Sequence, residues 1–277
     1  MANPLLGIID AIFAPSPLGF FLAVLAIFTV PILLHSFVFR PRGSQTLPTF
    51  LLLGPSSSGK TTLLTAFASP TPSETRVSQA PLSLEASIPA TLTASSKFRS
   101  SNDPSLRGTQ KFILQDTPGH GKLRPRAAEM LTKDTRGVVF VVDASTTDWS
   151  DAAEYLYTVL LRIQKLQESS SAGKGARTFN VLIACNKSDL FTALPAQRVR
   201  KLLEHELGRI REAKARGIVG VGEEDREDED WLGEGGSGDF TFESLEEVGC
   251  VVDFRLGSNR GDDGWRKQLN EWIGSCL

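Results

Sequence analysis

The octapeptide GPSSSGKT, residues 54–61, constrains this chain more than any other feature. It follows the apolar run 50–53 and precedes residues 62–68, whose apolar positions recur at helical spacing. A strand, a glycine-rich turn and a helix in this order are typical of a phosphate-binding loop. The glycines let successive backbone N–H groups point inward to phosphate oxygens at a helix N-terminus. The stretch therefore predicts that the chain binds a nucleoside triphosphate.

The side chains of this loop have separate expected roles. Lys60 would reach the β- and γ-phosphates, and the Thr61 hydroxyl would bind Mg²⁺. The residues predicted to bind nucleotide in this loop are Gly54, Pro55, Ser56, Ser57, Ser58, Gly59, Lys60, Thr61 and Thr62.

Length and composition exclude several other classes of protein. The chain has 277 residues, which suits one domain with appendages. Its formal net charge of −2 provides no basic field, so direct readout of nucleic acid is not expected. Three cysteines are too few for a disulfide framework, and no Cys/His cluster has metal-ligand spacing. The only metal that the sequence implies is the Mg²⁺ that accompanies the nucleotide.

Residues 18–39, LGFFLAVLAIFTVPILLHSFVF, carry no formal charge and one histidine. A helix of this length can cross a hydrocarbon core of about 30 Å. A buried core helix is rarely so long and apolar on every side, an interfacial helix needs a polar face, and a signal peptide needs a basic start. We therefore predict a transmembrane helix over residues 18–39.

Flanking charge predicts the orientation and the domain limits. Basic residues follow the span at Arg40 and Arg42, and none precedes it. The positive-inside rule then places residues 1–17 on the far side of the membrane and residues 49–277 in the cytosol, joined by a linker over 40–48. Within the cytosolic domain, residues 220–239 are acidic and glycine-rich, which predicts a flexible surface insertion.

Alternating segments predict the fold class. The runs 137–142 (GVVFVV) and 180–185 (NVLIAC) are typical of strands buried on both faces, and helical spacing follows each of them. This alternation predicts an α/β fold, a mostly parallel sheet with helices on both faces. Residues 92–95 and 111–114 are expected to pair as a hairpin. Ligands of such sheets bind beyond the carboxyl ends of the strands.

Two further motifs follow predicted strands. In DTPGH, Asp116 can hold Mg²⁺ through water, and the Gly119 amide can approach a γ-phosphate because no side chain intervenes. In NKSD, the Asp189 carboxylate can accept two hydrogen bonds from the guanine edge, which adenine does not offer. Asn186 begins this motif, and the aliphatic stem of Lys187 would cover one face of the base. The three motifs in this order predict GTP as the ligand.

This ordered set resembles the small-GTPase superfamily. The anchor directly before the loop, DTPGH followed by GKLR, and the acidic loop followed by FTFESL resemble the family of signal recognition particle receptor β subunits. The resemblance covers nearly the whole chain. It implies a P-loop small-GTPase fold on the cytosolic face of the endoplasmic reticulum, held by one transmembrane helix with residues 1–17 in the lumen. It also implies GTP and Mg²⁺ as cofactors.

The resemblance carries partners and further site residues. It implies that the GTP-bound form binds the N-terminal domain of the receptor α subunit, beside the lipid bilayer and the ribosome or translocon. Ser258 and Asn259 lie where such families place a loop that contacts the guanine oxygen. In the first switch, residues 74–81, Thr75 would sense the γ-phosphate through Mg²⁺, with Ser78 as the alternative. The implied metal set is Thr61, Thr75 and Asp116, the last through water.

Two functions stay open on the sequence. One is an Arf/Sar-type cycling GTPase that times coat or tether assembly on a membrane. The other is a receptor subunit in which GTP acts mainly as a switch ligand and hydrolysis is slow. The predicted anchor favours the receptor subunit, because Arf and Sar proteins attach to membranes reversibly. His120 either orients the attacking water as a catalytic residue or contacts a partner.

Overall fold

The structure is a computed structural model of the chain. It describes residues 21, 24, 25, 27–30, 47–69, 74–93, 108–146, 148–171, 178–219, 232, 240–260 and 263–277. These residues belong to two compact units, Met1–Thr46 and Leu47–Leu277, which we describe separately.

The first unit contains the predicted transmembrane segment. Seven of its residues are described, and all are helical and exposed: Phe21, Val24, Leu25, Ile27, Phe28, Thr29 and Val30. Within the described part of the chain, each helix is too short or too polar to cross a bilayer. The other residues of the predicted span 18–39 lie outside the described residues.

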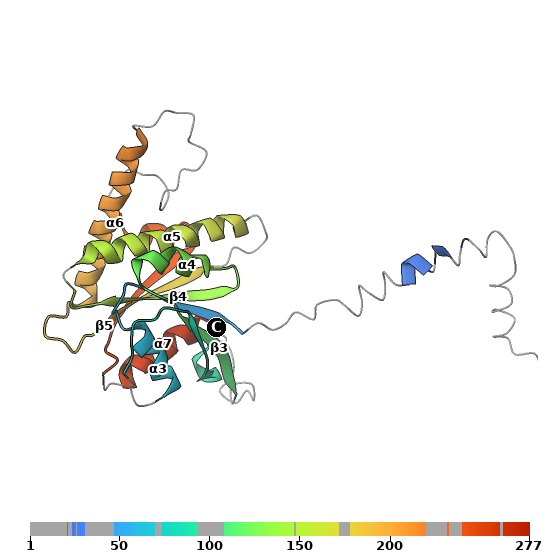
Figure 1. The fold of residues 1–277 in the computed structure, drawn as a ribbon, viewed down its shortest axis with the longest axis horizontal. Helices are drawn as coiled ribbons and strands as arrows, with labels where there is room; N and C mark the ends of the chain where they lie inside the picture. Colours follow the sequence, from blue (N-terminus) through green and yellow to red (C-terminus); the bar gives the residue numbers. More distant parts are fainter. Residues whose placement is uncertain are drawn as a thin grey trace, which may run out of the picture. The chain divides into compact units, whose positions relative to one another are not determined.

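The second unit contains a six-stranded sheet with the order β2-β3-β1-β4-β5-β6 (Figure 1). The strands are β1 (Thr49–Leu53), β2 (Leu82–Pro89), β3 (Thr109–Asp116), β4 (Thr135–Asp143), β5 (Phe179–Asn186) and β6 (Cys250–Leu256). The helices are α3 (Lys60–Ala68), α4 (Arg124–Glu129), α5 (Trp149–Ser171), α6 (Ala196–Val219) and α7 (Asp263–Cys276). Three 3₁₀ turns complete the described elements: η1 (Ala90–Leu92), η4 (Gly121–Leu123) and η6 (Phe242–Leu245).

Only the pairing of β2 with β3 is antiparallel among the described strands. The predicted mostly parallel α/β fold is therefore confirmed. In the register, Leu52 of β1 lies opposite Asp116 of β3, and Asp143 of β4 lies opposite Asn186 of β5. The carboxyl ends of these strands consequently meet at one edge of the sheet.

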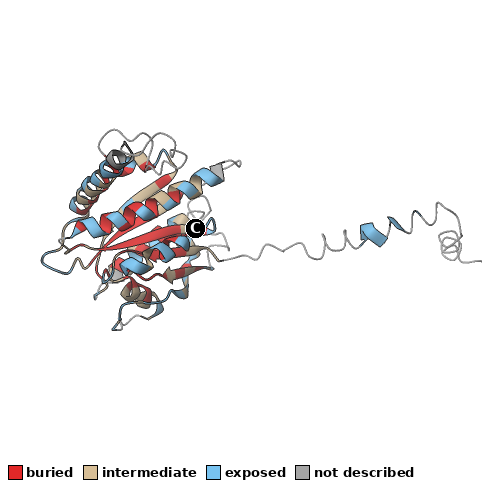
Figure 2. Cartoon of the chain, turned by 45° about the horizontal axis from the view of Figure 1, so that its top comes forward, coloured by how far each residue is buried: buried red, intermediate tan, exposed pale blue. Residues whose placement is uncertain are grey.

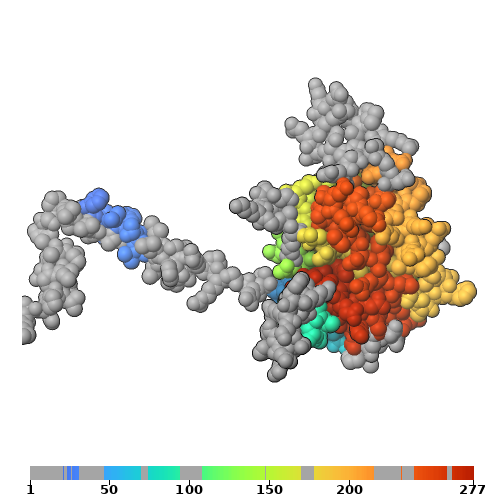
Figure 3. All heavy atoms as spheres, turned by 180° about the vertical axis from the view of Figure 1, so that it is seen from behind, coloured from blue at the N-terminus to red at the C-terminus, as the bar shows by residue number. Residues whose placement is uncertain are grey.

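Alternating residues of the central strands face two separate cores. Leu51, Phe140 and Ile183 pack with α4, α5 and α6, whereas Phe50, Val139 and Leu182 pack with α3 and α7. Figure 2 shows the central strands buried and α5 alternating between buried and exposed residues, as an amphipathic helix on a sheet requires. Seen from behind, the C-terminal residues gather on one face (Figure 3).

The predicted hairpin is wrong in its first strand. All of β3 pairs with Leu82–Pro89, and Leu92 belongs to the 3₁₀ turn Ala90–Leu92. Residues 94 and 95 lie outside the described residues. The strand LSLEASIP alternates apolar and polar residues from Leu82 to Ile88, a strand pattern that the prediction overlooked. It lies at the edge of the sheet, and only Ile88 in it is buried.

The predicted acidic insertion, residues 220–239, lies outside the described residues except for Leu232. The Leu232 side chain is buried in the core shared with Phe240 and Phe242. α6 extends to Val219, directly before the predicted insertion.

Alanine substitutions at two glycines inside helices should change the stability of the domain in opposite directions. A Cβ on Gly274 of α7 would lie 2.2 Å from the Leu92 carbonyl oxygen, whereas a Cβ on Gly208 of α6 would lie 3.7 Å from the Phe240 Cβ. Gly274→Ala should lower the free energy of unfolding by about 1–3 kcal/mol, because that backbone cannot move away without loss of packing. Gly208→Ala should raise it by about 0.5–1 kcal/mol through helix propensity. Urea unfolding of residues 47–277 would measure both, and a destabilised Gly208→Ala or a stabilised Gly274→Ala would contradict this packing.

Candidate functional site

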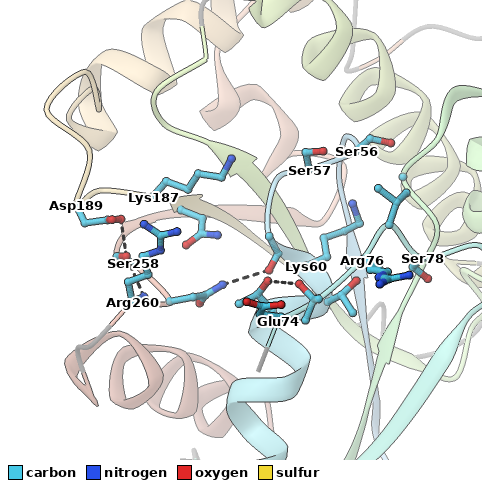
Figure 4. Close-up of a pocket in the computed structure, with 18 of the residues that line it drawn as sticks. Ser56, Ser57, Lys60, Glu74, Arg76, Ser78, Lys187, Asp189, Ser258 and Arg260 are labelled. Atoms are coloured by element: carbon cyan, nitrogen blue, oxygen red, sulfur yellow. Dashed lines mark hydrogen bonds between the residues drawn. The ribbon is translucent and has the colours of Figure 1, made fainter. Parts of the chain in front are cut away.

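A pocket of about 730 Å³ lies at the carboxyl edge of the sheet (Figure 4). Its walls come from segments far apart in the sequence: the loop after β1, residues 74–78, Gly119, the loop after β5, and the loop after β6. The predicted residues that line it are Ser56, Ser57, Gly59, Lys60, Thr61, Thr62, Thr75, Gly119, Asn186, Lys187, Asp189, Ser258 and Asn259.

The loop after β1 needs glycine at two positions. Gly54 has φ 137° and Gly59 has φ 96°, in the left-handed region that side chains disfavour. A Cβ on Gly54 would lie 2.2 Å from the Val141 carbonyl oxygen, and one on Gly59 would lie 2.2 Å from Asn186 Nδ2. The loop therefore curls tightly between β4 and β5 before α3 begins at Lys60, which leaves the free N–H groups of the first helical turn at the pocket.

Lys60 is a buried cation held by the loop itself. Its Nζ donates hydrogen bonds to the carbonyl oxygens of Gly54 at 2.8 Å and Pro55 at 2.6 Å. Burial lowers the pKa of Lys60 to about 8, while the nearby Asp116 carboxylate opposes that shift. A phosphate beside this ammonium would offset the cost of burying its charge.

Thr61 and Asp116 fit a magnesium ion. The Thr61 hydroxyl donates to Asp116 Oδ2 at 2.7 Å, and the other carboxylate oxygen, Oδ1, is buried without a hydrogen-bond partner among the described residues. Burial raises the pKa of Asp116, although the Thr61 and Lys60 side chains oppose the rise. A buried carboxylate oxygen without a donor beside a hydroxyl is a set of hard oxygen ligands that Mg²⁺ prefers.

The first-switch candidates both line the pocket but differ in their contacts. The Thr75 and Thr62 hydroxyl oxygens are 2.8 Å apart and share one hydrogen bond. The Ser78 hydroxyl instead donates to the Ala80 carbonyl within its own loop at 2.7 Å. The structure thus links Thr75, and not Ser78, to the helix that follows the phosphate loop.

The second switch, residues 116–120 (DTPGH), contains two neighbouring residues that differ in their position relative to the pocket. Gly119 is buried and lines the pocket, whereas His120 is exposed and is not among the lining residues. The His120 Nδ1 accepts a hydrogen bond from the Lys122 amide at 3.4 Å. His120 would have to move to act on a ligand in this pocket.

The loops after β5 and β6 meet at the far end of the pocket. The Ser258 hydroxyl donates to Asp189 Oδ1 at 2.6 Å, which orients the carboxylate (Figure 4). Asn186 Nδ2 donates to the Ser58 carbonyl at 2.9 Å, and Asn259 Nδ2 donates to the Gly59 carbonyl at 3.2 Å. Two asparagines therefore tie the base end of the pocket to the phosphate loop.

Asp143, at the end of β4, is a site residue that the sequence analysis missed. It accepts a hydrogen bond from Lys187 Nζ at 2.5 Å and two more from the Ser145 amide and hydroxyl at 2.9 and 2.6 Å. Burial alone would raise the pKa of Asp143, but these hydrogen bonds hold it below its ordinary value. An aspartate directly after the apolar run of β4 was the available signal, because it too ends a central strand.

Four other predicted residues do not line the pocket, but each forms a hydrogen bond with a residue that does. Gly54 and Pro55 bind Lys60, Ser58 binds Asn186, and Asp116 binds Thr61. His120 alone among the predicted residues is separate. The pocket also has charged lining residues that were not predicted, namely Glu74, Arg76 and Arg260.

The doubly covered sheet, the phosphate loop between β1 and α3 and the carboxylate-bearing loop after β5 define a P-loop small GTPase. The family model described as signal recognition particle receptor beta subunit matches residues 45–248. The signal recognition particle receptor subunit beta of Saccharomyces cerevisiae is 32% identical over 235 residues, which cover 81% of this chain and 84% of that protein. The chain therefore belongs to the family of signal recognition particle receptor β subunits.

Solved structures from Chaetomium thermophilum are similar in fold. The signal recognition particle receptor SRb-GTP/SRX complex matches with a TM-score of 0.65 and 31% identity, over 82% of this chain and 99% of that chain. The SRb-GDP-Mg structure matches with a TM-score of 0.59 and 32% identity, over 84% of this chain and all of that chain (100%).

The base end of the pocket predicts a change of nucleotide preference. Asp189→Asn should weaken GTP binding by about two orders of magnitude, because an amide cannot accept both guanine donors. The same variant should prefer xanthosine triphosphate, whose edge complements the amide. Competition between the two nucleotides would measure this, with Asp134→Asn, an exposed aspartate before β4, as the matched control. An unchanged GTP preference in Asp189→Asn would remove Asp189 from the base site.

Proposed function

We propose that this chain is a membrane-anchored GTP-binding subunit of the signal recognition particle receptor. In its GTP-bound form it recruits the receptor α subunit, through that subunit's N-terminal domain, to the endoplasmic reticulum for co-translational protein targeting. One observation carries the proposal: a phosphate loop and an oriented guanine-type carboxylate line the same pocket. Family membership supports the receptor role, because the similar SRb structures hold GTP with SRX, or GDP with magnesium.

At the phosphate end, the chain would bind the triphosphate with charge and backbone together. The amides at the start of α3 would donate to phosphate oxygens, and Lys60 would exchange its two carbonyl contacts for phosphate. Mg²⁺, when bound, supplies positive charge between the phosphates, and Thr61 and Asp116 are the residues that would hold it. Thr75 would complete the metal set from the first switch.

At the base end, Asp189 would discriminate guanine, and Ser258 would keep its carboxylate in the receiving orientation. Lys187 is fixed by Asp143, so its aliphatic stem would form one wall of the base slot. These contacts do not involve the γ-phosphate, so they would serve GTP and GDP alike.

The alternative is a cycling enzyme of Arf/Sar type that times assembly on a membrane. Rapid hydrolysis requires a residue that orients water at the γ-phosphate, and His120 is the candidate. Because His120 is exposed and bonded to the Lys122 amide, its placement favours GTP as a switch ligand with slow hydrolysis.

The residues around the two switches form the surface at which we expect the α subunit to bind. Val77 and Leu82 are 60% and 53% exposed, although both side chains are apolar. Lys122 and Arg126 are exposed beside the second switch, but Arg124 is paired with Asp151 and only 16% exposed. The surface that GTP would order thus offers apolar contacts and two exposed cations.

The nucleotide should control partner binding. GTP would order residues 71–81 and 116–126 into one surface, and GDP would release both, since only the γ-phosphate differs. The α-subunit N-terminal domain should then bind the GTP-analogue form at least about tenfold more tightly than the GDP form, about 1.4 kcal/mol. Titration of that domain against the two loaded forms would measure the ratio. Equal affinities would contradict the switch.

The anchor is the second part of the proposal. Residues 18–39 would span the bilayer with 1–17 in the lumen, and the linker 40–48 would hold the GTPase domain close to the membrane. The full chain should stay in the membrane pellet after alkaline carbonate, while a chain lacking the first 46 residues should be soluble and keep its GTP affinity. Release of the full chain by carbonate would contradict a transmembrane anchor, and loss of GTP binding on truncation would contradict the domain limits.

A further inference from the structure

We propose that Asp151, on α5 and outside every nucleotide motif, is a positioning residue for the GTP-bound state. Through Arg124 it holds the backbone at Gly119 against the phosphate loop, and so favours GTP over GDP. The inference rests on the proposed function, because it concerns the γ-phosphate end of the same site.

Gly119 lies in unusually close contact with the phosphate loop. A Cβ at this position would lie 2.5 Å from Lys60 Nζ and 2.6 Å from the Gly54 carbonyl oxygen. A side chain at position 119 therefore has no room between this backbone and the phosphate loop. The position of the Gly119 backbone then depends on contacts on the side away from that loop.

Arg124 holds it from that side. The Arg124 Nε donates to the Gly119 carbonyl at 3.2 Å, while the two terminal nitrogens donate to the two Asp151 carboxylate oxygens at 2.8 and 2.6 Å. All three nitrogens of one rigid guanidinium plane are thus used. Because the guanidinium is planar, the direction of the bond to Gly119 follows from the direction of the bidentate pair with Asp151.

The base of this arrangement is stiff. Asp151 and Tyr155 are four residues apart on α5 and so lie on one face of the helix, and the Arg124 guanidinium stacks over the Tyr155 ring at 4.9 Å. Tyr155 is itself buried, with its ring edge-on to Phe140 of β4 at 5.5 Å. Figure 1 shows α4 and α5 on the same side of the sheet. Arg124 is therefore fixed by stacking below and by the carboxylate at its end.

Nucleotide selectivity follows from which group Gly119 presents. Its amide is the expected donor to the γ-phosphate, which GTP has and GDP lacks. Without the Asp151 carboxylate, the Arg124 guanidinium can turn about its side-chain bonds and the Gly119 carbonyl loses a charged donor. Binding of the γ-phosphate would then include the cost of ordering this backbone, whereas binding of GDP would not.

The test compares three variants of the full chain in detergent. Asp151→Asn keeps the size of the side chain and removes its charge, and Asp151→Glu keeps the carboxylate. Glu168→Gln removes an exposed carboxylate further along α5, which accepts a hydrogen bond from Gln164 at 3.0 Å. The measured quantities are the dissociation constants of a non-hydrolysable GTP analogue and of GDP. Asp151→Asn should weaken the analogue about three- to tenfold and change GDP by less than about twofold. Asp151→Glu and Glu168→Gln should match the unmodified chain.

Arg124→Lys is the second route to the same state, because an ammonium cannot donate to Gly119 and to both carboxylate oxygens in one plane. It should reproduce the loss of analogue affinity with GDP unaffected. An unchanged analogue-to-GDP ratio in Asp151→Asn and Arg124→Lys, or an equal loss for both nucleotides, would overturn the inference and leave the pair a structural contact. If the unmodified chain binds neither nucleotide, the proposed function itself fails, so the two failures are distinguishable.

Discussion

The burial of β1 between β3 and β4 is the constraint on which the rest of the structure depends. Four of its five residues pair with β3 and all five pair with β4, both in parallel, with Leu52 opposite Asp116 and Leu53 opposite Phe140. Because β5 continues the same direction, Asp143 and Asn186 also end at this edge. The loops after β1, β3, β5 and β6 are distant in sequence and nevertheless open on one pocket.

The pocket so formed is electrostatically incomplete. Lys60 and Asp116 are buried. Burial lowers the pKa of Lys60 to about 8 and raises the pKa of Asp116, so it favours the neutral form of each side chain. Charged groups are held in such surroundings only when a partner of opposite charge accompanies them. A triphosphate and a divalent cation are partners of that kind. The free energy that it costs to bury these charges without a ligand therefore favours binding of the nucleotide and Mg²⁺. The base end is different. Asp189 is bonded to Ser258 and Lys187 to Asp143, so both side chains are already held in position by the protein.

The prediction from sequence succeeded where burial on both faces produces a distinct pattern. The runs of β4 and β5 form strands as predicted, and the motifs after β1, β3 and β5 meet at one edge of the sheet. Which of their residues bind nucleotide stays a prediction. The prediction from sequence failed at β2, where the alternating residues Leu82, Leu84, Ala86 and Ile88 were overlooked. It also missed that Asp143 pairs with Lys187 and that Arg124 lies between Asp151 and Tyr155. In these last two cases the deciding partner is on another element.

The sequence by itself determined the fold class, the family, the phosphate loop and the guanine motif, because each depends on residue types at short spacing. Glycine at positions 54 and 59 permits the positive φ values found there, and the parallel direction of the central strands follows from the alternation of strands and helices. Tertiary structure alone decided which charges meet. Whether Arg124 lies in solvent or against Asp151, and whether Lys187 reaches Asp143, depends on the packing of α5 and β4 on the sheet. Electrostatic interactions fall off with distance in space, and separation along the chain does not report that distance.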